Sequence, residues 1–335
     1  MSGLWQQRKR EVVMNKRERL AGVAGSGRGR TRRIAGKLLA AALVASAVAL
    51  PKAAQAQQTW TPTEILQDLG IWFDASDAAT IWSDTTASTP ATIDGGVARW
   101  DDKSTHNRHI TQATSGLRPI RRSGFLEFDG VDDILFNTSA FLYANGSNDI
   151  YIVAAAGADV GAVMIGEASS ANNNPLYTPI YRKPSGDRSI FTYWIRNTEN
   201  VVLVANTVDM SASGALDIAQ VRIYQAADTG NSVTARVNAA DPRSQSYTRA
   251  GTFTANQFGI GALPPRPNST AGFGSMRLDL REVVVATKVL SQEEREKVEG
   301  YLAHKWSLAA VLPEGHPYKS APPELRKTGT VISIR

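Results

Sequence analysis

Beyond residue 57, short runs of alternating apolar and polar residues are separated by Gly, Asn, Asp and Pro. This pattern is typical of antiparallel β-strands joined by turns. Many short strands with almost no helix predict an all-β fold, an antiparallel jelly-roll sandwich of two sheets, rather than several small domains. The predicted strands are Gly70–Phe73, Val97–Asp101, Phe125–Phe128, Asp133–Phe136, Asp149–Ala155, Ala162–Ile165, Ser189–Arg196, Val201–Val204, Leu216–Gln225, Ser232–Asn238, Tyr247–Phe253, Gln257–Ala262 and Met276–Ala286.

One helix is predicted near the C-terminus. Ser291 stands at the N-cap position and Glu294 three residues later, which is the capping-box pattern. An apolar stripe at helical spacing follows, and we expect it to pack on the sandwich. Its members are Val298, Tyr301, Leu302, Lys305 and Trp306. We expect the sandwich to cover residues 57–312, and residues 313–335, rich in Pro, Gly and charge, to form an extended tail.

Residues 1–56 have the features of an export signal. A basic stretch precedes a 13-residue apolar run, Leu38–Leu50, and Ala54-Gln55-Ala56 offers the small-x-small pattern of a signal peptidase site. Arg32-Arg33 ahead of an Ala-rich run resembles a twin-arginine signal, and an ordinary secretory signal with a long basic front stays open beside it. We therefore expect a periplasmic, cell-surface or secreted protein, and Met14 is an alternative start.

The leader changes the meaning of the charge. The whole chain is formally +6, with 37 Lys and Arg against 31 Asp and Glu. Residues 1–56 contain 12 of these basic residues and 2 of the acidic ones, which leaves 25 basic and 29 acidic residues, a net charge of −4. Nucleic-acid binding is excluded on this ground. The apolar run spans about 20 Å as a helix, short of the bilayer core of about 30 Å, so no membrane span is expected after cleavage.

Several motifs in a fixed order resemble a known family. They are Leu-Gly-Ile-Trp-Phe-Asp-Ala-Ser-Asp at 69–77, Trp-Asp-Asp-Lys-Ser at 100–104, Phe-Asp-Gly-Val-Asp-Asp at 128–133 and Ala-His-Lys-Trp at 303–306. Together they resemble the concanavalin A-like, laminin-G-like jelly-roll domains of bacterial exported and phage proteins over nearly all of residues 65–320. The resemblance implies the fold and no single activity, because that group holds lectins, glycosidases and adhesive modules.

Two carboxylates are candidates for catalysis. Strand alternation places Glu127 and Asp129 on one face, and Glu-x-Asp-x-x-Asp is similar to the Glu-x-Asp-x-x-Glu strand of jelly-roll glucanases. Retaining hydrolysis needs two carboxyl groups about 5–5.5 Å apart. Here the third carboxylate, Asp132, is one methylene shorter and follows a glycine. We therefore interpret Asp129-Gly130 as a hairpin turn and keep catalysis as an alternative.

A calcium site is a further expectation. Asp101, Asp102 and Asn107, together with Asp132 or Asp133, offer oxygen ligands, of which Ca²⁺ takes about 6–8. The resemblance adds to this expectation, because laminin-G-like relatives often bind calcium. No compact Asp-x-Asp-x-Asp loop is present, so capping of turns by these side chains is the alternative interpretation.

Alternation also predicts one polar sheet face that carries aromatic rings. Its outward positions include Trp194 and Arg196 in one strand, Arg222 and Tyr224 in a second, and Arg236 in a third. If these strands are neighbours, two aromatic rings lie among three arginines. That arrangement suits a sugar ring, which has apolar faces and polar edges. The alternative is an ordinary Trp194 covered by a loop.

From these patterns we expect an exported, non-catalytic module that binds extracellular or cell-surface carbohydrate, with Ca²⁺ or no cofactor. A structural or adhesive assembly subunit that binds protein partners is the first alternative. A glycoside hydrolase or polysaccharide lyase that uses Glu127 and Asp129 is the second.

Overall fold

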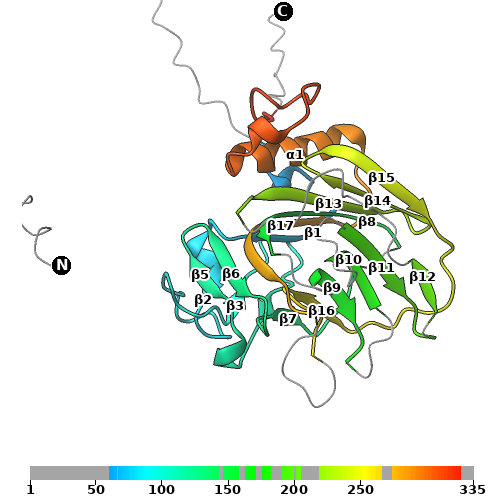
Figure 1. Ribbon diagram of the computed structural model, residues 1–335. Helices are drawn as coiled ribbons and strands as arrows, with labels where there is room; N and C mark the ends of the chain where they lie inside the picture. Colours follow the sequence, from blue (N-terminus) through cyan, green and yellow to red (C-terminus); the bar gives the residue numbers. More distant parts are fainter. Residues whose placement is uncertain are drawn as a thin grey trace, which may run out of the picture. The chain divides into compact units, whose positions relative to one another are not determined.

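The computed structural model describes residues 60–65, 67–142, 146–157, 163–170, 176–182, 191–199, 201–204, 219–265 and 274–325. The predicted export signal lies outside these residues. The described chain forms two antiparallel sheets and one α-helix (Figure 1), which confirms the predicted two-sheet sandwich. Within this part of the chain, no helix combines the length and the apolar content needed to cross a bilayer.

The first sheet has eight strands, and its longest strand, β17 (Arg277–Ala286), organises it. One edge of β17 pairs with β8; along the other edge, β6 pairs with residues 277–280 and β1 with residues 282–286. The order is β15-β14-β13-β8-β17-β6-β5, with β1 beside β17. The remaining bounds are β1 (Leu69–Asp74), β5 (Ile120–Arg122), β6 (Phe125–Asp129), β8 (Asn148–Ala156), β13 (Arg222–Asp228), β14 (Ser232–Val237) and β15 (Ala240–Ser246).

The second sheet has nine strands and lies against the first. Its order is β12-β11-β10-β9-β16-β7-β4-β3-β2. The main core fills the space between the sheets with residues such as Phe73, Trp100 and Phe128, all with no exposed surface. The bounds are β2 (Ile81–Trp82), β3 (Arg99–Trp100), β4 (Ile110–Thr111), β7 (Leu135–Asn137), β9 (Val163–Ala168), β10 (Leu176–Arg182), β11 (Phe191–Arg196), β12 (Val202–Val204) and β16 (Gln257–Ile260).

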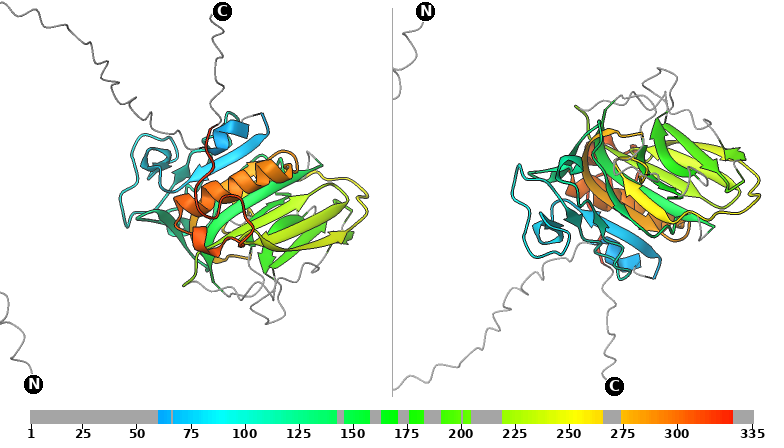
Figure 2. Two further views of the ribbon diagram at one scale, coloured as in Figure 1. Left: turned by 90° about the horizontal axis from the view of Figure 1, so that it is seen from above. Right: turned by 90° about the horizontal axis from the view of Figure 1, so that it is seen from below.

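Helix α1 (Gln292–Lys305) covers part of the outer face of the first sheet (Figure 2). Both hydrogen bonds of the predicted capping box are present between Ser291 and Glu294. Val298, Tyr301 and Leu302 are buried in a second apolar cluster with outer-face residues of β1, β8, β13 and β17. The predicted stripe therefore packs on the sandwich as expected, because its apolar side has a second apolar surface to cover.

A buried carboxylate locks the end of α1 to the sheet. Glu282 on β17 has no exposed surface. Its oxygens accept hydrogen bonds from Trp72 Nε1 (2.8 Å), Tyr301 Oη (2.9 Å) and Trp306 Nε1 (2.6 Å). Lys305 Nζ lies 2.8 Å from Glu282 and 2.8 Å from Asp74, which is buried on β1. The helix is thus held by directional bonds in addition to apolar contact.

The segment after α1 folds back over the helix. Residues 309–311 form a short 3₁₀ helix, and Leu312 is buried in the cluster beneath α1. Tyr318 lies so close to Gly300 of α1 that a Cβ at Gly300 would stand 2.5 Å from Tyr318 Cβ. Further on, the amide of Trp60 donates to the carbonyl of Pro323 at 2.9 Å. The two ends of the described domain therefore meet.

The strand prediction differs from the structure in several places. Tyr247–Phe253 lies outside the strands, and the neighbouring strand is β15 (Ala240–Ser246), which was not predicted. Pro242 interrupts the local pattern of β15, but β15 ends the sheet, where proline is tolerated. The strand β10 was also missed. The strands β2, β4 and β5 were missed as well, because two or three residues are too few to show alternation.

Candidate functional site

The five predicted sugar-binding residues do not share a face. Trp194 and Arg196 belong to β11 in the nine-stranded sheet, whereas Arg222 and Tyr224 belong to β13 and Arg236 to β14 in the other sheet. The assumed adjacency therefore holds for β13 and β14, which pair with each other, and is wrong for β11, which lies in the other sheet. The side chain of Trp194 lies outside the described residues, and its role stays a prediction.

The predicted outward direction of Tyr224 is also wrong. Tyr224 is 1% exposed and lies in the core between the sheets, and Arg222 has the same parity on β13. The next position, Ile223, faces α1 and is buried in the outer cluster. Because β13 is buried on both faces and mixes polar with apolar residues on each, alternation could not tell one face from the other. Arg236 does face outward, and its Nη1 donates to Gln225 Oε1 at 2.8 Å.

Asp101 and Asp102 are occupied by protein donors. Asp101 accepts from Trp82 Nε1 at 2.7 Å and from Arg99 Nε at 2.6 Å. Asp102 is buried and accepts from the backbone amides of Trp72 (2.9 Å), Ser104 (2.9 Å) and Arg108 (3.0 Å). These bonds fix the loop that follows β3, as the turn-capping interpretation predicts.

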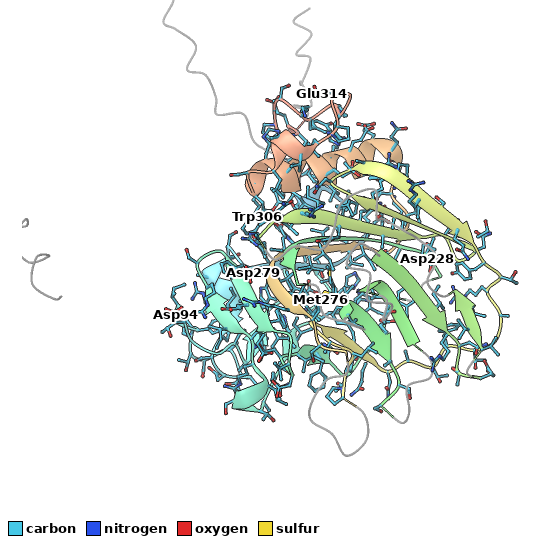
Figure 3. All side chains as sticks on the ribbon, viewed as in Figure 1. Asp94, Asp228, Met276, Asp279, Trp306 and Glu314 are labelled. Atoms are coloured by element: carbon cyan, nitrogen blue, oxygen red, sulfur yellow. The ribbon has the colours of Figure 1, made fainter. Side chains whose placement is uncertain are left out.

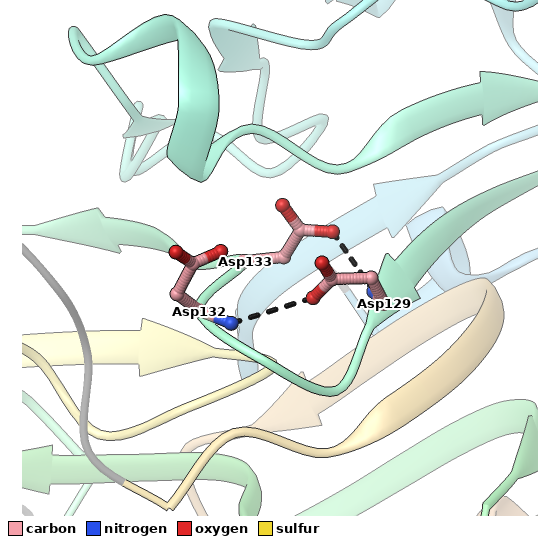
Figure 4. Close-up of side chains that lie close together, drawn as sticks. All are labelled: Asp129, Asp132 and Asp133. Carbon is pink, nitrogen blue, oxygen red and sulfur yellow. Dashed lines mark hydrogen bonds between the residues drawn. The ribbon is translucent and has the colours of Figure 1, made fainter.

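The structure groups Asp132 with Asp129 and Asp133, and not with Asp101 and Asp102. Among the described residues, carboxylate oxygens of these three lie within 4.8 Å of one another in the turn after β6 (Figure 4). Asp129 Oδ1 accepts from the amide of Val131 at 2.7 Å, and Asp133 Oδ2 accepts from the amide of Asp129 at 2.8 Å. The oxygens are of the type that hard cations prefer, and two of the three carboxylates already close the turn.

The turn places Asp133 where its ionised form is unfavourable. Burial, opposed by the hydrogen bond from Asp129 and assisted by the neighbouring negative charges, raises the pKa of Asp133 to about 6. Gly130 has φ of +81°, and a Cβ there would stand 2.8 Å from the amide nitrogen of Arg277. Glycine is therefore required here, and the predicted turn at Asp129-Gly130 is present. It is not a hairpin, because β6 and β7 on either side of it belong to different sheets.

Beside this turn, the outer face of β6 and β17 carries a polar strip that we call the β6–β17 face. It consists of outward residues of β6 and β17 together with Arg122 of β5. Leu126, Phe128, Leu278 and Leu280 point into the core, so the residues between them point outward. Register pairs Glu127 with Asp279 and Asp129 with Arg277. The face comprises Arg122, Phe125, Glu127, Asp129, Arg277, Asp279 and Arg281.

Glu127 and Asp279 form a pair of unlike carboxylates at the middle of this face. Directly opposite residues of an antiparallel pair have Cβ atoms about 4.5–5.5 Å apart. Glu127 Oε2 accepts from Arg122 Nε at 2.5 Å, and 29% of its side chain is exposed. Asp279 is more enclosed: burial raises its pKa, Arg281 opposes this and Glu127 adds to it. The two carboxylates therefore differ in their surroundings: Glu127 is held by an arginine, and Asp279 lies in a more enclosed position.

An aromatic ring and an arginine flank the carboxylate pair. The guanidinium of Arg281 lies 5.1 Å from the ring centre of Phe125. The register of β17 shifts between Leu280 and Glu282, so Arg281 is the extra residue of a bulge and points outward beside Asp279. Trp306, at the end of α1, bounds the face near Gly124, where a Cβ would stand 3.9 Å from Trp306 Cζ3. Figure 3 labels Trp306 and Asp279.

Part of this face was visible in the sequence. Glu127 and Asp129 were predicted to share a strand face, and the burial pattern of β6 confirms this. Asp279 was missed, although the alternation of Arg277, Asp279 and Arg281 with two leucines marks them as outward. What the sequence lacks is the register that sets Asp279 opposite Glu127, 152 positions away.

No family model matches the chain, and no curated protein matches it in sequence. Among solved structures, it is similar to a Trypanosoma rangeli sialidase in complex with sialic acid, with a TM-score of 0.45 and 13% identity over 71% of this chain and 33% of that one. It is also similar to a botulinum neurotoxin serotype D binding domain, with a TM-score of 0.43 and 8% identity over 70% of this chain and 52% of that one. The chain thus spans about a third to a half of these proteins. The likeness concerns the fold alone, and nothing about the chemistry of this chain follows from it.

Proposed function

We propose that this chain is an exported carbohydrate-binding module, of the concanavalin A-like, laminin-G-like kind, that contacts extracellular or cell-surface glycan through the β6–β17 face. The observation that carries this proposal is the combination on one partly exposed strip of carboxylate acceptors, guanidinium donors and an aromatic ring. Sugar hydroxyl groups donate to carboxylates such as Glu127 and accept from arginines such as Arg281, and Phe125 offers an apolar surface to the C–H face of a sugar ring.

The pairing of donors with acceptors supports a neutral or weakly charged glycan. Arg122 beside Glu127 and Arg277 opposite Asp129 balance much of the negative charge of the strip. Arg281 lies over Phe125, and a guanidinium in that position can donate to a ring oxygen or hydroxyl of a sugar seated on the same aromatic side chain.

The test is a binding panel of soluble polysaccharides, laminarin, xylan, pectin and chitosan, in affinity electrophoresis and calorimetry. Phe125→Ala and Arg281→Ala are expected to weaken binding at least tenfold, whereas Arg243→Ala, an exposed arginine on β15, leaves it unchanged. Circular dichroism confirms folding of each variant. No retention on any glycan, or equal binding by all variants, contradicts the proposal. Loss of binding in Trp194→Ala alone moves the site to the nine-stranded sheet.

A further inference from the structure

We propose that Asp149, a carboxyl group buried beneath α1, makes the attachment of α1 to the sandwich depend on pH. The helix is held firmly while Asp149 carries a proton and is loosened when Asp149 is ionised. The inference concerns α1 together with the segment after it, residues 312–319, and it does not depend on the glycan proposal.

Asp149 lies on the outer face of β8, beneath the start of α1. It has no exposed surface, and Tyr151, two residues along the same strand, belongs to the apolar cluster under the helix. Asp149 Oδ1 accepts from Gln225 Nε2 of β13 at 2.7 Å, and Oδ2 accepts from the amide of Leu290 at 3.3 Å. Leu290 immediately precedes Ser291, the N-cap residue of α1. Asp149 therefore ties the beginning of the helix to two strands of the first sheet.

The two donors that hold Asp149 are neutral amides. Within the part of the chain that the structure describes, Asp149 forms no ion pair, in contrast to Asp74 and Glu282 at the other end of the helix. A buried carboxylate without a charged partner is unfavourable, because its charge is withdrawn from water and only partly compensated. The protonated acid is the form that suits this position.

The sheet brings one cation and one phenol to the surroundings of Asp149. Arg236 of β14 directs its Nη1 to Gln225 Oε1 at 2.8 Å, so the glutamine stands between the guanidinium and the carboxyl group. Burial raises the pKa of Tyr151 well above its usual range, and the charge of Asp149 adds to this. Tyr151 therefore remains a neutral phenol at every pH of interest.

The charged groups on the helix side are directed to a second buried carboxylate, Glu299 of α1, which is 2% exposed. Arg295 Nε lies 3.7 Å from Glu299 Oε1. His316 accepts from the amide of Tyr318 at Nδ1 (3.2 Å), so its Nε2 carries the hydrogen that it donates to Glu299 Oε2 (3.1 Å). The segment after α1 is thus fastened to Glu299, and the negative charge of Glu299 acts on Asp149.

This arrangement gives the pH dependence a direction. Burial raises the pKa of Asp149 to about 7; the hydrogen bonds from Gln225 and Leu290 oppose the rise, and the charge of Glu299 adds to it. When the helix lifts, water reaches the carboxyl group and its pKa returns toward the ordinary value of about 3.9. The closed state is therefore favoured most at low pH, and that preference is lost as the pH rises through about 7.

Hydrogen exchange of the full chain, followed by mass spectrometry, measures the loosening. Protection factors, corrected for the intrinsic exchange rate at each pH, are compared at pH 5 and pH 7.5. We expect protection in the first half of α1 to fall at least about tenfold between these values, while α1 stays less protected than β17 at pH 7.5. The far end of α1 keeps its bonds to Glu282, so the effect begins near Leu290.

Two variants remove the titrating charge and one control keeps it. Asp149→Asn and Asp149→Leu should each reduce the change in α1 protection to less than about threefold. Glu293→Gln, which alters an exposed carboxylate on the same helix, should keep the wild-type dependence. Circular dichroism verifies that each variant is folded.

Three results would overturn the inference. The first is equal protection of α1 in the wild-type chain at the two pH values, which decides the matter even where a variant does not fold. The second is an undiminished pH dependence in the folded Asp149 variants, which places the titrating group elsewhere, as at His316. The third is equal protection of α1 and β17, because the helix then leaves only when the whole domain unfolds.

Discussion

Replacement of Lys305 by methionine tests how α1 is attached to the sandwich. Lys305 Nζ neutralises two buried carboxylates, Asp74 and Glu282, at 2.8 Å each. Asp74 keeps Lys103 at 2.9 Å after the change, but Glu282 keeps only the neutral donors of two tryptophans and a tyrosine. Removing one partner of a buried ion pair costs about 3–5 kcal/mol, and since 21% of the Lys305 side chain is exposed we expect about 3 kcal/mol.

The loss should depend on pH in a defined direction. Burial already raises the pKa of Glu282, and without Lys305 nothing charged opposes it within hydrogen-bond distance. A carboxyl group whose pKa is raised in the folded state lowers the free energy of unfolding as the pH rises through that pKa. At lower pH the group is protonated in both states and this loss is absent. The difference between Lys305→Met and wild type should therefore shrink as the pH is lowered and Glu282 takes up a proton.

Urea unfolding of the full chain, followed by tryptophan fluorescence, measures the effect. The matched control on the same helix is Lys297→Met, whose ammonium group lies 2.8 Å from the exposed Glu293, and there we expect less than about 0.5 kcal/mol. Adding Glu282→Gln to Lys305→Met should recover most of the loss, because the buried charge is gone. A loss below about 1 kcal/mol, or one equal to that of Lys297→Met, refutes the reasoning.

Three further predictions test other parts of the chain. Gly300→Ala should destabilise the protein by about 1–3 kcal/mol in denaturant unfolding, because the added methyl group meets Tyr318; a gain of about 1 kcal/mol, as helix propensity alone gives, would contradict the close approach. The raised pKa of Asp133 makes its ionisation unfavourable in the folded state, so the free energy of unfolding should decline between about pH 4 and pH 6. Asp133→Asn should remove this decline and stabilise the protein at pH 7.5 by about 1–2 kcal/mol. Parallel pH profiles of variant and wild type refute this. Exchange of Arg32 and Arg33 for lysine should block export by a twin-arginine route and spare an ordinary secretory route. The amount of exported protein measures the effect, and its N-terminal sequence identifies the cleaved form.

The fold could be predicted from the sequence wherever the two faces of an element meet different surroundings. β6 shows apolar Leu126 and Phe128 between outward residues, and α1 carries a complete capping box, so both were readable locally. β13 was misread because Ile223 meets α1 while Tyr224 meets the core. Both sides of β13 are buried, and its sequence does not indicate which side meets the core and which meets α1.

The candidate site depended on information that no local pattern contains. Membership of a sheet decides whether Trp194 and Tyr224 can be neighbours, and strand register decides which carboxylate faces Glu127. Both are set by pairings between distant segments. The entropy lost on closing the loops between them, and the free energy gained by the contacts, depend on the whole chain. The chemistry of single residues, such as Asp129 as a turn former, was predictable because it needs only its immediate neighbours.

The hydrogen bond between Trp60 and Pro323 brings the beginning and end of the folded domain to one point. Joining these ends by a short linker and opening the chain at a surface turn elsewhere would give a circular permutant with unchanged strand pairing. The same proximity means that tension applied through both ends acts first on the contacts between these end segments, before either sheet is sheared.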